Sequence, residues 1–382
     1  MKTNFTSYLC LLMLSSSLAF SQHSETADLK KNIQVKLDSL RELYQFPGAT
    51  FAVILPNGER FSVATGVADS LNRIPMETGH RMLSGSNGKT LFVAAALILE
   101  AEGAFDLDDP ISTYLREEAW FHRLPNASGI TMRMLMNHTS GLEEYYGLGD
   151  FMEKVRKNPY ASYSPLETFS YVFDRKPLFE AGTDWAYADT NFLLLGYIVE
   201  KISGRKMYDL IEEHIIRPYH LEQTEPSINP QLRNLAVGYS GEHSPFPFHG
   251  AMVYNDSLVF NPQFEWAGGG FISNVNDLAG WAKTFYQFDA IAEENRAEMQ
   301  ERVVAKTGKD HYYGLGVQIR PSEDLGYSYG HSGWFPGYVT DAVYFPDVDL
   351  AMAIQFNSDD FRIMKMPAYA YLLELSKLLQ VN

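Results

Sequence analysis

Ser86 and Lys89 are the residues whose types and spacing most directly suggest chemistry. They lie in the run LSGSNGKT, residues 83–90, and an apolar segment of helical character, 91–100, follows at once. Residues three apart at the start of a helix lie on one face, so the hydroxyl and the amine can touch. A serine hydroxyl becomes a good nucleophile when a neighbour takes its proton. A lysine can do so if burial or a nearby cation lowers its pKa from about 10.4. N–H groups at the helix start would face an oxyanion beside Ser86.

The same four-residue pattern occurs a second time. Ser203 and Lys206 have the same spacing, but they follow the apolar segment 192–202. Gly204 at its end is typical of a helix C-cap. We therefore interpret the second copy as a turn and assign the nucleophile to Ser86.

Three further segments carry polar side chains where helices or strands are expected to begin or end. Tyr187 and Asp189 precede an apolar helical segment, and residues 331–334 stand on a strand signal near the C-terminus. Residues 137–142 follow a short apolar helix. We interpret His138 in that segment as a packing residue at the helix end.

Metal and nucleotide chemistry find no support in the motifs. The ten histidines show no H-E-x-x-H or comparable spacing. The glycines at 268–270 lack the dinucleotide fingerprint, and no G-x-S-x-G elbow is present. We expect neither a metal nor a cofactor. The formal net charge is −16 with no long basic run, so a nucleic-acid surface is not expected.

The elements that must position these residues come from both ends of the chain. Segments 49–55 and 60–68 are strand-like, and the turn signal at 56–59 predicts a hairpin. Further strand-like and helical segments are expected near the C-terminus: strands at 313–319, 327–330, 339–345 and 350–356, and helices at 276–286 and 364–379. Residues 22–45 are polar and helix-like. The middle is mostly helical, so we predict an α/β (α+β) domain from 22–85 and 265–382, with a helical lobe at 86–264.

The first 21 residues are typical of a secretory signal. Lys2 supplies the positive charge, residues 8–20 are largely apolar, and Ala19 to Ser21 supply small residues for cleavage. We expect a mature chain that starts at Gln22, with an uncleaved anchor as the alternative. The protein would then be exported, to the periplasm or the outside. No later segment reaches about 18 continuous apolar residues, so no stable membrane span is expected.

Taken together, the motifs resemble those of the serine β-lactamase and penicillin-binding protein superfamily. That family has S-x-x-K, then Y-x-N, then K/H-[ST]-G in this order, and the chain is most similar to its class C-like branch, with the DD-carboxypeptidases and related esterases. Ancillary segments extend the resemblance over nearly all of the mature chain, about 30–375: residues 107–110, 138–142, 269–272 and 313–316. The resemblance implies a mainly antiparallel sheet flanked by helices, with an inserted helical lobe.

The resemblance also implies roles for the motif residues. Ser86 would attack a carbonyl and form an acyl-enzyme, while Lys89 and Tyr187 would shuttle the proton, with the cation favouring the tyrosine phenolate. The backbone N–H groups of Ser86 and Trp334 would hold the oxyanion. Gly333 would let the strand approach the substrate closely, and His331 would be a proton-linked donor near Tyr187.

Asp189 departs from the family, which most often has Asn at this position. An amide can donate a hydrogen bond to a substrate carbonyl, whereas an ionised carboxylate only accepts. Asp189 would instead pair with Lys89, keep that lysine charged and shift the base role to Tyr187. The alternative is a purely structural carboxylate.

Gln318 marks a second departure. DD-carboxypeptidases of this branch have an arginine after the Y-G-L-G strand, which receives the terminal carboxylate of the substrate. This chain has Gln318 there, and Arg320 two residues on would share its face in a regular strand. A neutral amide lacks the charge-assisted, bidentate geometry of arginine. We therefore expect weak carboxypeptidase activity and better hydrolysis of neutral esters or blocked peptides.

These observations predict a secreted serine hydrolase that acts through an acyl-enzyme on an amide or ester. Peptidase, β-lactamase and esterase activities are not separated by the sequence. The alternative is a catalytically silent member of the same fold that binds peptidoglycan or a protein. The expected partner is a small-molecule or peptide substrate, for example a cell-wall peptide.

Overall fold

The computed structural model describes residues 5–287 and 290–379, with side chains from residue 25 onward except that of residue 294. Residues 1–4 of the expected signal lie outside this range, and residues 5–24 are described as backbone only, within helix α1 (Phe5–Tyr44). The predicted cleavage site at 19–22 therefore has no described side chains, and the leader stays a prediction. No helix of the described ranges is long and apolar enough to cross a membrane.

A large antiparallel sheet organises the described residues. Its strand order is β11-β12-β13-β14-β15-β16-β1-β2-β3. Strand β1 (Gly48–Ile54) lies between β2 (Arg60–Asp69) and β16 (Leu350–Phe356), so the two ends of the chain meet inside one sheet. The other strands are β3 (Ile74–Pro75), β11 (Val303–Val304), β12 (Tyr312–Tyr313), β13 (Gln318–Ser322), β14 (Gly326–Phe335) and β15 (Tyr338–Phe345).

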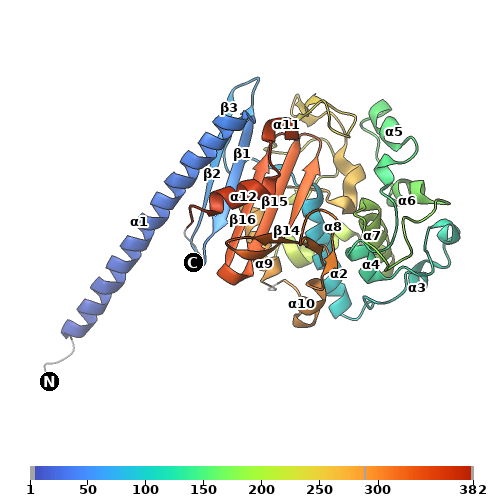
Figure 1. Cartoon of the computed structure of the whole chain (residues 1–382), viewed down its shortest axis with the longest axis horizontal. Helices are drawn as coiled ribbons and strands as arrows, with labels where there is room; N and C mark the ends of the chain where they lie inside the picture. The colour runs from blue at the N-terminus through green and yellow to red at the C-terminus, as the bar shows by residue number, and fades with distance from the viewer. Residues whose placement is uncertain (1–4, 288–289, 380–382) are drawn as a thin grey trace.

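Side chains point alternately to the two faces of the sheet along each strand, and a separate hydrophobic core covers each face. Phe51 and Ile354 are partners in the sheet, and both point to a core closed by α1 and α12 (Ala368–Ser376). Ala52 and its partner Ala353 point to the other face, where α9 (Val275–Tyr286) packs. Small side chains on this face let the helix approach closely. Figure 1 shows α12 in front of the sheet and α9 behind it.

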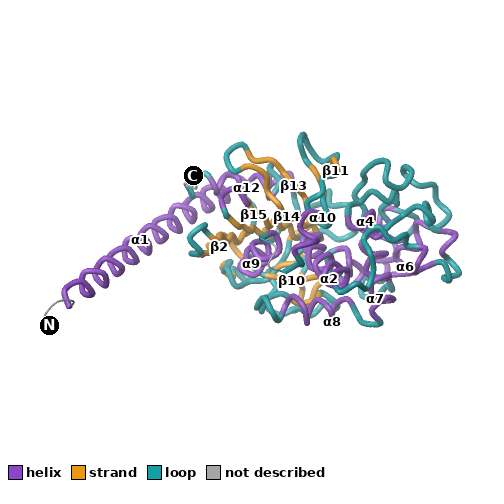
Figure 2. Tube along the Cα trace, turned by 90° about the horizontal axis from the view of Figure 1, so that it is seen from below, coloured by secondary structure: helices purple, strands orange, loops and turns teal. Residues whose placement is uncertain are grey.

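The helical region lies beside the second face of the sheet, as Figure 2 shows from below. Its main helices are α2 (Lys89–Ala101) and α7 (Asp189–Ser203), which lie among buried apolar side chains. Shorter helices complete it: α3 (Ser112–Leu115), α4 (Met132–Met136), α5 (Phe151–Lys157), α6 (Pro165–Phe169) and α8 (Met207–Ile211). Short strands also occur: β4 (Met82–Leu83), β5 (Glu225–Pro226), β6 (Tyr239–Ser240), β7 (Gly250–Ala251), β8 (Val253–Tyr254), β9 (Ser257–Leu258) and β10 (Phe271–Ser273).

The predicted fold class is confirmed, while some element boundaries are wrong. The hairpin at 49–68 forms as expected. The strand expected at 313–319 is interrupted by a turn at 314–317 between β12 and β13, because Gly316 adopts a left-handed conformation with φ of 64°. The final helix is interrupted before Pro367, leaving α11 (Phe361–Met364) and α12, since proline cannot continue a helix. The domain boundaries at 85/86 and 264/265 stay predictions.

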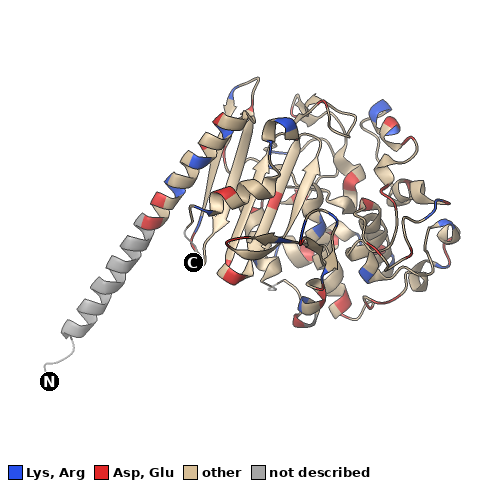
Figure 3. Cartoon of the chain, viewed as in Figure 1, with Lys and Arg blue, Asp and Glu red and all other residues tan. Residues whose placement is uncertain are grey.

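Positions of basic and acidic residues are interspersed along the ribbon of the described residues in Figure 3. Helix α10 (Glu293–Met299) carries acidic residues near the lower edge of the molecule in this view.

Candidate active site

Ser86 lies on a one-turn 3-10 helix, Gly85–Gly88, that leads directly into α2. Strand β4 precedes this turn and pairs with β10, with Leu83 opposite Ile272. The loop 266–270 just before β10 is thereby brought against the turn. A Cβ built on Gly88 would come within 2.3 Å of the Gly269 carbonyl oxygen, so the two backbones are in direct contact.

Strand β14 closes the turn from the other side. A Cβ on Gly333 would lie 1.8 Å from the Ser84 carbonyl oxygen, and a Cβ on Gly85 would lie 2.5 Å from the Trp334 backbone nitrogen. We expected Gly333 to let the strand approach the substrate. In the structure it instead lets the strand approach the turn that holds Ser86. The same contact places the Trp334 N–H, one of the expected oxyanion donors, beside the turn that holds Ser86.

Lys89 is fully buried and uses all three of its ammonium hydrogens. Its Nζ donates to Ser86 Oγ at 2.9 Å, to Asp189 Oδ1 at 2.5 Å, and to the Gly268 carbonyl oxygen. The predicted contact of hydroxyl and amine is thus present, and so is the predicted Lys89–Asp189 pair. Three acceptors thus surround the Lys89 nitrogen.

Tyr187 lies just before α7, with its ring 5.1 Å from Lys89 Nζ. Its buried hydroxyl makes no hydrogen bond of ordinary geometry with the described residues. Burial, followed by the charge of Asp189, raises the pKa of Tyr187 well above its ordinary value, and the nearby Ser86 hydroxyl opposes this only in part. The expected phenolate does not fit the resting site, because burial and the charge of Asp189 both favour the neutral phenol of Tyr187.

His138 holds the segment that carries Tyr187. Its carbonyl oxygen accepts from Ala186 N at 3.1 Å, its Nδ1 accepts from Ala188 N at 3.3 Å, and its ring packs on the Tyr187 ring at 4.3 Å between centroids. The expectation that His138 packs at a helix end agrees with this position after α4. We had no sequence signal for its hold on Tyr187.

His331 does not contact the Tyr187 hydroxyl as a donor. Its Nδ1 donates to the Ser332 carbonyl oxygen at 2.6 Å, which leaves Nε2 to accept from the Tyr313 hydroxyl at 2.8 Å. Tyr313 in turn lies 3.2 Å from His138 Nε2. Burial, followed by the Lys89 charge, lowers the pKa of His331 to about 3. The expected proton-linked donor is therefore corrected to a neutral acceptor that orients Tyr313.

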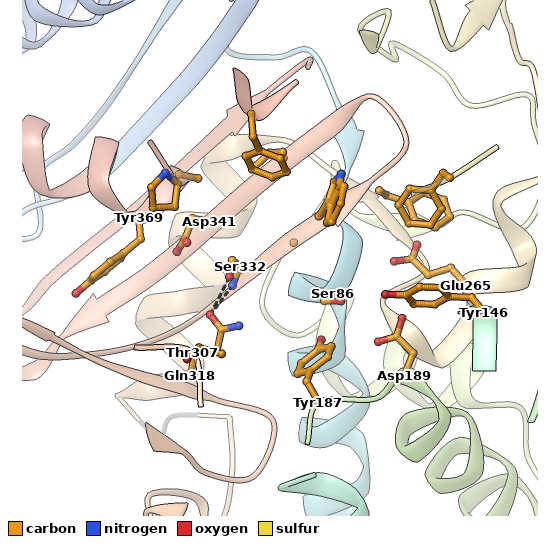
Figure 4. Close-up of a pocket in the computed structure, with 18 of the residues that line it drawn as sticks. Ser86, Tyr146, Tyr187, Asp189, Glu265, Thr307, Gln318, Ser332, Asp341 and Tyr369 are labelled. Carbon is orange, nitrogen blue, oxygen red and sulfur yellow. Dashed lines mark hydrogen bonds between the residues drawn. The ribbon is translucent and has the colours of Figure 1, made fainter. Parts of the chain in front are cut away.

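A cavity of about 400 Å³ opens at Ser86. Figure 4 shows Tyr146, Asp189 and Glu265 on one side of Ser86 and Gln318, Ser332, Asp341 and Tyr369 on the other. Aromatic side chains complete much of the wall: Tyr145, Phe246, Phe264, Trp334, Phe335 and Phe361. The cavity therefore joins a polar centre to a large apolar surface, as ligand sites commonly do.

Two of the predicted substrate-binding residues lie together at the second end of the cavity. Gln318 Oε1 accepts from the Ser332 backbone N–H at 3.1 Å and from its hydroxyl at 2.8 Å. The Arg320 guanidinium is buried and forms two hydrogen bonds to Asp341, at 2.8 and 2.7 Å. Gln318 and Arg320 share a face as expected. Asp341 neutralises the charge of the Arg320 guanidinium through these two bonds.

The structure thus brings Ser86, Lys89, Tyr187 and Asp189 together, with the Trp334 backbone beside them. The Trp334 indole instead points to Asp359 and is 37% exposed. The other S-x-x-K copy is a turn, as predicted: Gly204 ends α7 with φ of 67°. The described residues contain no cluster of metal-binding side chains.

Two acidic residues of the site were missed by sequence reasoning. Glu144 Oε2 accepts from the Asp189 backbone N–H at 2.5 Å, and Glu265 is buried in the cavity wall. Burial, with Asp189 adding to it, raises the pKa of both carboxyl groups well above the ordinary value. A charged residue inside the apolar run 264–267 was the available signal for Glu265. Glu144 gave none.

Comparisons with known proteins agree with this geometry. The family model described as Beta-lactamase matches residues 33–375. The chain is 26% identical to penicillin-binding protein 4* of Bacillus subtilis over 83% of this chain and 69% of that protein. It is 25% identical to a D-aminopeptidase of Brucella anthropi over 82% of this chain, which spans only 56% of that protein. A D-stereospecific amidohydrolase from Streptomyces superposes with a TM-score of 0.76 at 26% identity, covering 88% of this chain and 97% of that one.

Proposed function

Since the chain belongs to the β-lactamase family and is a serine hydrolase of that fold, we propose that it hydrolyses an amide or ester through an acyl-enzyme on Ser86. The observation that carries the proposal is the Ser86 Oγ–Lys89 Nζ contact of 2.9 Å at the mouth of the 400 Å³ cavity. The names of the D-aminopeptidase and the D-stereospecific amidohydrolase support an amide substrate.

Lys89 is positioned to pass a proton through the site. Lys89 first gives a proton to Asp189 Oδ1 at 2.5 Å, and the neutral amine so formed takes the proton of Ser86 as Oγ bonds to the substrate carbonyl carbon. This relay removes the need for a neutral lysine at rest. The N–H groups of Ser86 and Trp334 would stabilise the oxyanion.

Tyr187 is suited to the opposite transfer. Its neutral phenol can donate a proton to the leaving nitrogen as the carbon–nitrogen bond breaks. The phenolate so formed would then take a proton from the water that attacks the acyl-enzyme. The oxygen of Ser86 recovers its proton from Lys89, Lys89 recovers one from Asp189, and the site returns to its starting state.

Export remains part of the proposal. The chain would be secreted and cleaved near Ser21, and its substrate would be a small amide, ester or peptide such as a cell-wall fragment. Lys2 and the apolar run that follows it support export. The geometry of the site does not bear on it.

Intact mass measurement tests the central claim. The wild-type protein should gain one fluorophosphonate adduct, located on Ser86 by peptide mapping, and Ser86→Ala should gain none. Ser203→Ala is the matched control and should label like wild type. Labelling that survives in Ser86→Ala and is lost in Ser203→Ala would contradict the assignment.

A further inference from the structure

Glu265 is a buried acid, and one of its two carboxyl oxygens is unpaired within the described part of the chain. Its side chain belongs to the cavity wall, the residue is only 4% exposed, and Oε2 has no hydrogen-bond partner among the described residues. A structural carboxylate in such a place is normally satisfied by a cation or by N–H donors. Glu265 therefore has an unpaired carboxyl oxygen in the wall of the cavity.

The cations around it are already engaged. Lys89 uses its three hydrogens on Ser86, Asp189 and the Gly268 carbonyl, and Arg320 is held by Asp341. The buried histidines nearby, His138 and His331, are neutral because burial lowers the pKa of both. No cation of the described site remains for Glu265.

The charged groups at this end of the cavity lead to the same conclusion. Burial, with repulsion from Asp189 added, raises the pKa of Glu144 and of Glu265 well above the ordinary value, although the Lys89 charge opposes the rise. Figure 4 shows Glu265, Asp189 and the Tyr146 hydroxyl gathered on one side of Ser86. A cationic ligand at this end of the cavity would lower the pKa of Glu265 and stabilise its ionised form.

We propose that Glu265 receives an ammonium group of the substrate. The substrate class is then an amide or ester whose acyl part carries a free amine, with an apolar side chain packed on the aromatic wall near Phe246 and Trp334. This inference rests on the proposed function of Ser86 and adds the chemistry of the group beside it. Glu265 would bind the amine and leave the proton transfers to Lys89, Asp189 and Tyr187.

Calorimetry on a variant without the Ser86 hydroxyl measures amine binding independently of catalysis. In the Ser86→Ala protein, 2-phenylethylamine should bind at least about tenfold more tightly than 2-phenylethanol, which is about 1.4 kcal/mol. Adding Glu265→Gln should abolish that preference. Glu153→Gln, which removes the same charge from exposed helix α5, is the control and should keep it. Equal binding of amine and alcohol by Ser86→Ala overturns the inference even if the Glu265 variant does not fold.

Kinetics supply the second test. With Ser86 intact, the ratio of kcat/KM for a free-amine aminoacyl ester to that for its N-acetyl derivative should fall at least about tenfold in Glu265→Gln. An unchanged ratio overturns the inference, while fluorophosphonate labelling of Ser86 in the same samples reports separately on the proposed function. Absence of labelling in wild type would remove the acyl-enzyme and leave amine binding to be judged by calorimetry.

Discussion

Lys89 is the residue on which the proton movements of the site depend. Its ammonium lies between a nucleophile and a carboxylate, at 2.9 Å from Ser86 Oγ and 2.5 Å from Asp189 Oδ1. A lysine with one acceptor on each side can give a proton to the carboxylate and then take one from the serine. Asp189, which departs from the family pattern, is thus part of the proposed relay. In that proposal Lys89 takes the proton of Ser86, and Tyr187 donates a proton to the leaving nitrogen.

Replacing Tyr187 tests that division. Tyr187→Phe should slow acylation by an amide by about 10² or more, because the leaving nitrogen needs a proton. Acylation by an activated nitrophenyl ester, whose leaving group needs none, should slow much less. Stopped-flow measurement of both substrates decides the matter. Equal slowing would make Tyr187 the base for Ser86 instead.

The neutral state of His331 predicts a pH dependence. The unfolded imidazole has a pKa of about 6.5, and the folded one is lowered to about 3 by burial. The unfolded chain therefore binds the extra proton as pH falls below 6.5, and the folded state loses about 1.4 kcal/mol per pH unit from this residue. Above pH 6.5 His331 contributes nothing to the slope. Ring nitrogen shifts in NMR spectra should stay unchanged from pH 8 to 5, and titration near 6.5 would contradict the buried placement.

The Arg320–Asp341 pair predicts little preference for a substrate carboxylate. One acyl-D-Ala-D-Ala peptide, compared as free acid and as amide, should give kcat/KM values within about 100-fold, or 2.7 kcal/mol. The reason is that Gln318 is neutral and Asp341 already occupies the guanidinium. A larger preference for the free acid would restore a dedicated carboxypeptidase.

At the scale of elements, the Ser86 turn is held by backbone on both sides. Loop 266–270 and strand β14 press on it through Gly88, Gly269 and Gly333, with no side chain between them. Trp266 adopts φ of 37°, a conformation that costs a non-glycine residue about 1–3 kcal/mol. The nucleophile is thus positioned by contacts between main chains.

Gly333→Ala should expose this dependence. The added methyl group meets the Ser84 carbonyl at 1.8 Å, so the free energy of unfolding should fall by about 1–3 kcal/mol. Displacement of Ser86 should cost about 10² in kcat/KM. Gly280→Ala in α9 is the control, since a methyl group there meets nothing within 4 Å and should stabilise by about 0.5–1 kcal/mol. Denaturant titration and ester hydrolysis check both variants, and similar behaviour of the two would refute the backbone contact.

Helices and strands with a clear periodicity of apolar residues could be predicted from the sequence. Turns and breaks that depend on the conformation of a single residue could not. The 49–68 hairpin and the 192–202 helix follow from local pattern. The turn at 314–317 and the break at Pro367 depend on one conformation each. At the site, motif spacing predicted Ser86, Lys89, Tyr187 and Asp189. Their chemical states follow from burial, which requires the tertiary structure. Glu144 precedes one 3-10 helix, Tyr145–Gly147, and Glu265 lies in another, Pro262–Gly268. No local pattern predicts that either lies beside Ser86.

At the scale of the whole molecule, α1 connects the expected leader to the folded body. Its second half packs on the sheet through Ile33, Leu37 and Leu40. Cleavage near Ser21 would shorten the helix and leave this packing in place. N-terminal sequencing of secreted protein should therefore begin at or near Gln22. Full-length protein confined to the interior of the native cell would contradict export.

The pairing of β1 with β16 joins Ala49 to Phe356, near opposite ends of the chain. A growing polypeptide therefore makes Ser86 early and the strands that enclose it last. Pairing over such sequence distances is slow compared with local helix formation. Until β14 to β16 have emerged and docked, the serine stands on an open turn without its opposing strand, and the nascent chain cannot hydrolyse what it meets. Reactivity begins when the sheet closes, so the first labelling of Ser86 during refolding marks the end of folding itself.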